Sequence, residues 1–280
     1  MRLFLIPLTP RRAFVYGHHV AQEVTKKRSL LDRAITKSSD IWLKWEKYEK
    51  GWQKQLTVHG NRLLRRIPYQ EWSLKSVSAL PRNIPDNERQ KVPVVYPPSV
   101  MTPGEIPRLL HKLGTENSGM HRRLLMWCLI GMPISAPFAL VPMFMATRIP
   151  NIPFFYLVFR AYSHWRALQG GRHLEFLVKN NLLDPQPDTQ LDRIYKTKIE
   201  RVVEDVNIDK ETIQQAAEAG VMDEAAEEHL QEEFELIGEP TAKEVAEVLK
   251  IPQLVVELER ACEQVHEQVE VKRKGVKKEL

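Results

Sequence analysis

The sequence has few of the features that define the common catalytic and cofactor-binding classes. Only two cysteines are present, Cys128 and Cys262, and they are so far apart that neither a disulfide framework nor a thiolate metal cluster is predicted. The 12 glycines form no Walker loop or dinucleotide-binding pattern, and no nucleophile elbow or paired-histidine zinc helix occurs. We therefore expect a protein that is not an enzyme and that holds no cofactor or metal ion.

Long hydrophobic runs are equally scarce, since the chain contains one. Mean hydropathy is −0.37, which excludes a polytopic transporter made mostly of lipid-facing helices. The run is Leu124–Thr147, 24 residues without a charged side chain. A straight helix of that length covers about 36 Å, enough for a hydrocarbon core of about 30 Å.

Prolines interrupt this run and shape the membrane prediction. Lys and Arg flank both ends of the apolar region, which continues over Ile149–Phe159, so we expect a Pro-broken, membrane-embedded helical hairpin. A buried helical hairpin in a soluble protein is the alternative. The region between 124 and 159 contains no carboxylate, and its candidate polar and helix-breaking residues are Arg148, Ser135, Thr147, Pro133, Pro137 and Pro142.

Charge is distributed unevenly along the chain. Residues 1–130 contain 23 Lys and Arg against 10 Asp and Glu, whereas residues 131–280 contain 18 against 26. A uniformly basic nucleic-acid-binding protein does not show this reversal, so no nucleic-acid partner is expected.

The patterning divides the chain into four regions. Residues 1–76 are expected to form a β-hairpin from Leu3–Ile6 and Ala13–Tyr16, followed by a long basic amphipathic helix over about 23–66. Residues 77–120 contain a Pro-rich linker, in which Pro93 should keep Val92–Tyr96 out of a central strand. Residues 121–180 are the membrane-associated segment, and residues 181–280 are a polar, acidic helical region with a basic tail.

Smaller signals refine the helical regions. Thr241 and Glu244 match a capping box that opens a helix, and further helices are expected around Ile194 and from Leu254 onward. Gly170–Gly171 fits a helix-ending turn at least as well as a phosphate cradle. The fold class is therefore mainly α, with long amphipathic helices, the broken hairpin and a minor N-terminal β-hairpin.

Several strings resemble one protein family. These are MRLFLIPLTPRR at Met1–Arg12, WEKYEKGW at Trp45–Trp52, RIPYQEW at Arg66–Trp72 and, above all, PFALVPMFMATRIPNIPFFYLVFRAYSHWRALQGGRHLEFL from Pro137 onward. They are similar to the fungal mitochondrial potassium–hydrogen exchange-related proteins. The resemblance covers roughly residues 1–180, implies a mitochondrial inner-membrane protein and transfers no functional residue.

An ion carrier usually needs a titratable or coordinating group near the bilayer midplane, and the apolar region has no carboxylate. We therefore expect an accessory or regulatory component of mitochondrial potassium/proton exchange, concerned with ion homeostasis and organelle volume. Its partners would be the lipid bilayer and proteins of an exchanger complex, with potassium and protons involved indirectly. The alternative is a membrane-associated interaction or scaffold protein with no transport role, in which the basic Trp-rich helix lies on anionic lipid.

Overall fold

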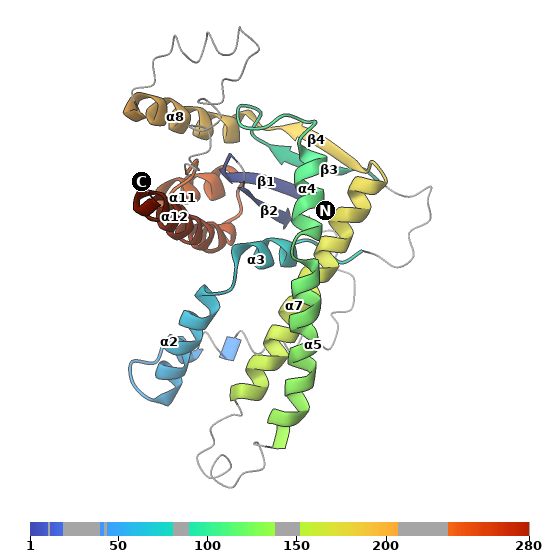
Figure 1. The fold of residues 1–280 in the computed structure, drawn as a ribbon, viewed down its shortest axis with the longest axis vertical. Helices are drawn as coiled ribbons and strands as arrows, with labels where there is room; N and C mark the ends of the chain where they lie inside the picture. Colours follow the sequence, from blue (N-terminus) through green and yellow to red (C-terminus); the bar gives the residue numbers. More distant parts are fainter. Residues whose placement is uncertain are drawn as a thin grey trace. The chain divides into compact units, whose positions relative to one another are not determined.

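The computed structural model describes residues 1–10, 12–18, 40–41, 44–80, 90–137, 152–206 and 235–279. The chain forms two units, one made of residues 1–18 and 69–280 and the other of residues 19–68. The first unit contains a sheet with helices on both of its faces (Figure 1).

The sheet has four strands in the order β2-β1-β3-β4. Strands β1 (Arg2–Thr9) and β2 (Arg12–His18) pair antiparallel, which confirms the predicted N-terminal hairpin. Strands β3 (Val92–Tyr96) and β4 (Leu183–Pro187) add to it in parallel, so the sheet is larger than expected.

The expectation that Pro93 excludes a central strand is wrong, because β3 lies between β1 and β4. The N–H of Val92 donates to the carbonyl of Leu182, just before β4, at 2.7 Å. Backbone groups alternate sides along a strand, so the nitrogen of Pro93 faces β1. Pairing with β1 covers only Val94 and Val95, and the missing N–H of Pro93 therefore costs no ladder bond.

Side-chain alternation along the strands supplies two separate cores. Leu3, Leu5 and Val94 face one core, whereas Phe4, Ile6 and Val95 face the other. The first core is closed by the helices α3 (Tyr69–Ser76), α4 (Ile106–Thr115) and α7 (Ile152–Lys179). The second core is closed mainly by α8 (Thr189–Val206), α11 (Glu239–Val248) and α12 (Leu254–Glu279).

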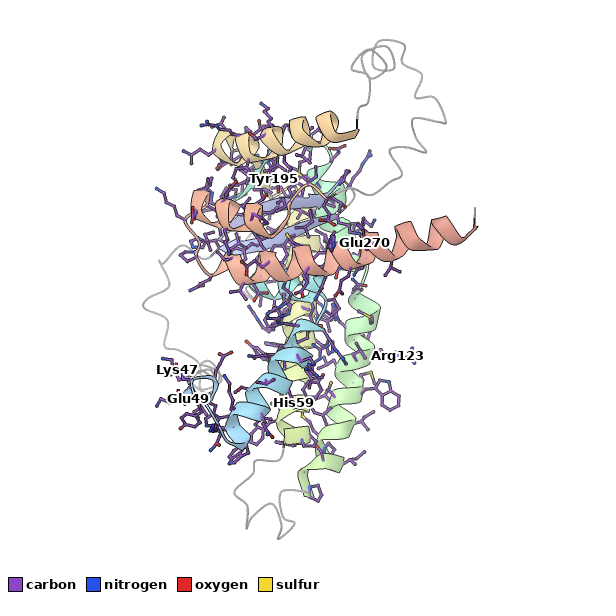
Figure 2. All side chains as sticks on the ribbon, turned by 90° about the vertical axis from the view of Figure 1, so that its left-hand side faces the viewer. Lys47, Glu49, His59, Arg123, Tyr195 and Glu270 are labelled. Atoms are coloured by element: carbon purple, nitrogen blue, oxygen red, sulfur yellow. The ribbon has the colours of Figure 1, made fainter. Side chains whose placement is uncertain are left out.

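The helices of the C-terminal region confirm the periodicity of residues 189–206 and of the segment from Leu254 onward. Tyr195 on α8 lies between that helix and the sheet, where its hydroxyl donates to the carbonyl of Pro7 at 2.9 Å (Figure 2). The capping box prediction is wrong: α11 begins two residues before Thr241, and Gly238 is its N-cap residue. Pro240 occupies the first turn, where a missing N–H costs nothing.

A helical hairpin is present within the expected segment 121–180. Helix α5 (Ser118–Ser135) runs antiparallel to the N-terminal half of α7, and the two lie side by side in Figures 1 and 2. The embedding of this hairpin in a membrane has no support from the described helices, none of which is sufficiently long and apolar to cross a bilayer.

The glycine pair Gly170–Gly171 lies inside α7, so the interpretation as a helix-ending turn or phosphate cradle is wrong. A Cβ at Gly170 would overlap the carbonyl oxygen of Leu74 on α3. A Cβ at Gly171 would lie 2.6 Å from the carbonyl oxygen of Gly114 on α4. The pair therefore allows α3 and α4 to approach the backbone of α7 closely, which fixes α3 against the hairpin helix.

The second unit contains α2 (Trp52–Arg65) within the stretch predicted as one long amphipathic helix. Gly51 precedes α2 with a φ of 112°, a conformation that favours glycine, so the predicted long helix is interrupted there. Trp45 and Trp52 meet edge-to-face, with 5.4 Å between ring centroids. Residues 19–39 lie outside the described part of the chain.

Candidate functional site

Three of the six residues singled out from the sequence lie in the described part of the chain, in α5 or directly after it. Pro133 lies in the last turn of α5, Pro137 follows the helix, and the Ser135 hydroxyl donates to the carbonyl of Met132 at 3.0 Å. Pro142, Thr147 and Arg148 lie outside the described residues.

A buried polar cluster lies instead near the root of the α5–α7 hairpin, where three helices meet. Helix α3 contributes Glu71, α5 contributes His121, and α7 contributes Arg160, Ser163 and His164. The three residues of α7 share one helical face because they are spaced i, i+3 and i+4. The close packing of α3 on α7 at Gly170 holds Glu71 beside this face.

The carboxylate of Glu71 is the centre of the cluster. Its side chain is 1% exposed and accepts two hydrogen bonds from the guanidinium of Arg160, at 2.9 and 3.2 Å. The hydroxyl of Ser163 also donates to Oε1 of Glu71. A bidentate pair with a further donor compensates the high cost of burying a carboxylate.

The two histidines continue this network. Arg160 donates from Nη2 to Nε2 of His164 at 3.0 Å, so that nitrogen is the acceptor and the ring proton of His164 lies on Nδ1. Nδ1 of His164 lies 3.1 Å from Nδ1 of His121, which must then accept. The proton of His121 is left on Nε2, a buried atom without a hydrogen-bond partner among the described residues.

Burial keeps both imidazoles neutral. Burial is the main cause that lowers the pKa of His164 to about 4; Glu71 opposes the shift, and Arg160 adds to it. Burial likewise lowers the pKa of His121. The cluster therefore presents two neutral imidazoles and a carboxylate at neutral pH, a set that can hold a divalent cation or a fixed hydrogen-bond network.

Sequence reasoning missed this cluster for a definite reason. It searched residues 124–159 for a carboxylate, whereas Glu71 arrives from a helix more than fifty positions earlier. The two histidines also lie just outside that interval, one on each side. The sequence did contain one signal: Arg160 and His164 are four residues apart, so on a helix they lie on one face. Arg160 can then donate a hydrogen bond that His164 accepts.

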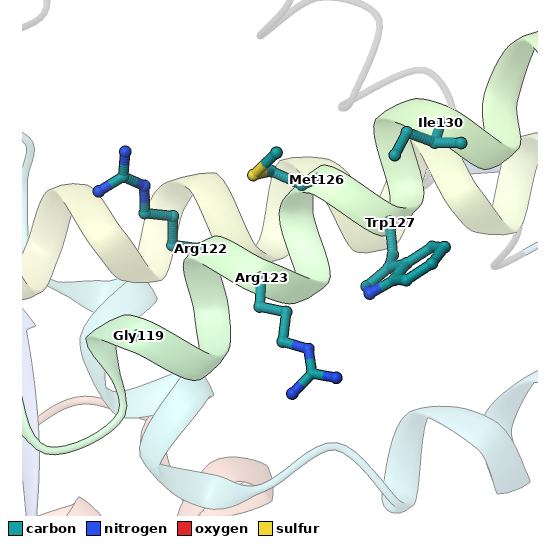
Figure 3. Close-up of a pocket in the computed structure, with 6 residues that line it drawn as sticks. All are labelled: Gly119, Arg122, Arg123, Met126, Trp127 and Ile130. Carbon is teal, nitrogen blue, oxygen red and sulfur yellow. The ribbon is translucent and has the colours of Figure 1, made fainter.

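A second feature of the hairpin is its exposed apolar surface. On α5, Met126, Trp127, Ile130 and Ile134 are each at least half exposed, and on α7 Phe155 is 59% exposed. Figure 3 shows two stripes on α5: Met126 and Ile130 follow Arg122 on one, and Trp127 follows Arg123 on the other. A shallow pocket runs along these side chains.

The fold and the cluster together define a class. The body is mainly helical, as predicted, with a small mixed sheet. It bears a helical hairpin that exposes apolar side chains and is joined to the body by a buried ion pair. The chain belongs to the mitochondrial K⁺–H⁺ exchange-related family, whose sequence model matches residues 2–178. This confirms the resemblance inferred from the sequence, and the family's description points to the mitochondrion and to ion homeostasis.

Two fungal proteins are similar to the chain. "Uncharacterized protein YDL183C" of Saccharomyces cerevisiae is 27% identical over 208 residues, which cover 65% of this chain and 63% of the yeast protein. "Uncharacterized protein C23H3.12c" of Schizosaccharomyces pombe is 29% identical over 198 residues, covering 70% of this chain and 83% of that protein. The chain thus spans less than two thirds of the length of the Saccharomyces relative. No solved structure matches it.

Proposed function

We propose that the protein is an accessory component of mitochondrial potassium/proton exchange that acts at the inner membrane, without catalysing a reaction and without forming the ion path. The observation that carries the membrane part is the exposed apolar surface of the hairpin, with Trp127 61% and Ile134 67% exposed. An apolar surface of this kind on a soluble body is a site for a membrane or a protein partner.

The arrangement of charge favours the lipid surface. Arg122 and Arg123 precede the apolar stripes by one turn, so the apolar side chains can enter the acyl region while the guanidinium groups meet lipid phosphates. Trp127 is suited to the boundary between these layers. The hairpin would therefore enter one leaflet with the C-terminal end of α5 leading, and the sheet would stay outside the bilayer.

The accessory role follows from the charge inside the hairpin. The carboxylate of Glu71 is buried beside the hairpin, but it is already paired with Arg160. The positive charge of Arg160 repels a potassium ion at that position. An ion-conducting site elsewhere in the exchange machinery fits the proposal better than one in this chain.

Binding of the purified chain to vesicles tests the membrane step. Vesicles that contain cardiolipin should bind the wild type, and Ile130→Glu should weaken binding by at least about tenfold, because a carboxylate replaces an inserted apolar group. Val256→Glu is the matched control, since Val256 is 58% exposed on α12 and lies outside the hairpin. Equal loss in both variants, or no vesicle binding by the wild type, would contradict the proposal.

Transport is tested separately in fungal mitochondria. Deletion of the gene should slow swelling in potassium acetate, the wild type should restore the rate, and Ile130→Glu should restore less than Val256→Glu does. The purified protein alone in liposomes should give no coupled K⁺/H⁺ flux. Coupled flux would overturn the accessory role, and unchanged swelling after deletion would favour a scaffold without a transport role.

A further inference from the structure

The geometry points to a divalent transition-metal site of the Zn²⁺ class formed by Glu71, His121 and His164, a function separate from membrane binding. One ligand atom from each residue lies within 4.8 Å of the other two, and all three residues are buried. Two imidazole nitrogens and one carboxylate oxygen are a common ligand set for zinc.

The distances between the ligand atoms suit a tetrahedral ion. Bonds of about 2.0–2.1 Å to zinc place neighbouring ligands about 3.3–3.4 Å apart. Nδ1 of His121 and Nδ1 of His164 are 3.1 Å apart, and Nδ1 of His164 is 3.7 Å from Oε2 of Glu71. These two edges differ from the tetrahedral spacing by a few tenths of an ångström, and the edge between His121 and Glu71 lies within 4.8 Å.

His121 supplies an independent observation. Its side chain is 1% exposed, and its Nε2 has no hydrogen-bond partner among the described residues. An unsatisfied buried donor usually costs about 1–3 kcal/mol, so the hydrogen bond at Nδ1 accounts for only one of the two ring nitrogens at this position. A divalent cation bound at Nδ1 would give the ring a second, stronger contact, because the donor set of two imidazoles and one carboxylate is already gathered there.

Glu71 has one oxygen available for the ion. Ser163 and the shorter bond from Arg160 engage Oε1, whereas Oε2 accepts only the longer Arg160 bond at 3.2 Å and faces His164. Carboxylate ligands in metal sites are commonly held by hydrogen bonds from outside the coordination sphere, and the hydroxyl of Ser163 would hold Oε1 in this way.

Arg160 is the competing cation at this site. If His164 binds a metal through Nδ1, its proton moves to Nε2, and that nitrogen no longer accepts from Arg160. The side chain of Arg160 is 14% exposed, so the guanidinium has access to solvent when it turns away. Metal binding and the Arg160–His164 hydrogen bond should therefore exclude one another.

Titration of the purified full chain with Zn²⁺ tests this inference. The reference protein is Cys128→Ser/Cys262→Ser, so that thiols do not contribute, and it should bind one Zn²⁺ per chain. His121→Ala should weaken binding by more than about 100-fold, since loss of an outer-sphere partner alone usually costs about 10–100-fold. His111→Ala is the matched control, because His111 is an exposed histidine on α4.

Two further measurements do not depend on the folding of His121→Ala. Arg160→Gln should bind Zn²⁺ about tenfold more tightly than the reference, because a buried cation is removed. X-ray absorption of the Zn²⁺-loaded wild type should show two imidazoles with oxygen ligands and no sulfur. No Zn²⁺ binding by the reference protein, full binding by His121→Ala, weaker binding by Arg160→Gln, or sulfur ligation would each overturn the site.

Discussion

The buried ion pair between Glu71 and Arg160 makes a quantitative prediction for the variant Glu71→Gln. The substitution preserves the size of the side chain and removes its charge. The amide oxygen can still accept from Ser163 or Arg160, but the amide nitrogen carries hydrogens and cannot accept the second guanidinium bond. Arg160 is then left as a largely buried cation without its counter-charge.

Burial determines the size of the effect. Removal of one partner of a buried pair usually costs about 3–5 kcal/mol, and we expect about 3 kcal/mol, because Arg160 is 14% exposed and recovers some hydration. Glu175→Gln, on α7, is the matched control. Glu175 pairs with Lys179 at 2.8 Å, but these side chains are 33% and 65% exposed, so the loss should be about 0.2–1 kcal/mol.

Urea denaturation of the purified chain, followed by far-ultraviolet circular dichroism, gives the free energies of unfolding. The double variant Glu71→Gln/Arg160→Met should lose less stability than the sum of the two single variants, by about 1–3 kcal/mol, because the second change removes the unpaired charge. A cost below about 1 kcal/mol for Glu71→Gln, or equal costs for Glu71→Gln and Glu175→Gln, would refute the assignment of this pair as a structural anchor.

Two other predictions follow from packing and from electrostatics. Gly170→Ala should destabilise the protein by about 3 kcal/mol or more, because the added Cβ overlaps the carbonyl of Leu74. Gly119→Ala is the control, since there is open space around Gly119, and it should be neutral or stabilising by up to about 1 kcal/mol. Equal shifts of the thermal unfolding midpoint in the two variants would contradict the close helix contact. Burial raises the pKa of Asp192. Hydrogen bonds from Lys196 and from the backbone of Ser99 lower it by a larger amount, so the pKa of Asp192 is below its ordinary value. The folded state then binds fewer protons, so the stability from Asp192 is present above its unfolded pKa and is lost as pH falls through the folded pKa; Asp192→Asn should reduce this acid dependence of urea midpoints, and an unchanged pH profile would disprove it.

Sequence patterns were sufficient to predict the elements whose own residues supply the apolar face that they bury. The N-terminal hairpin and helix α8 could be predicted from the periodicity of apolar residues, which is two residues in a strand and about 3.6 residues in a helix. Strand β3 did not follow, since the tolerance of Pro93 depends on which neighbour its nitrogen faces and on where pairing with β1 starts. Helix α11 shows the same limitation, because Gly238 begins it without a side-chain cap.

The polar cluster was beyond sequence reasoning because its members come from three helices. No spacing rule connects Glu71 with His121 or His164, and the fold brings them together through a helix contact at Gly170. The glycine pair was noticed, but its role requires knowledge of which backbones approach it. The pairing of helices in the apolar region was predicted correctly, whereas its embedding in a membrane has no support from the described helices.

The position of the cluster gives the ion pair a role beside that of the close helix packing at Gly170. If the exposed face of α5 contacts lipid, apolar contacts along the hairpin provide little force to fix its orientation, because lipid tails solvate Trp127 or Ile130 as well as protein does. A hydrogen-bonded ion pair is directional, and the one between Glu71 and Arg160 joins α3, which packs on the sheet, to α7, which continues into the hairpin. We infer that this contact sets the angle at which the hairpin leaves the body. A metal ion bound by Glu71 and both histidines would join α5 to the same point, and the angle would then respond to metal as well as to lipid.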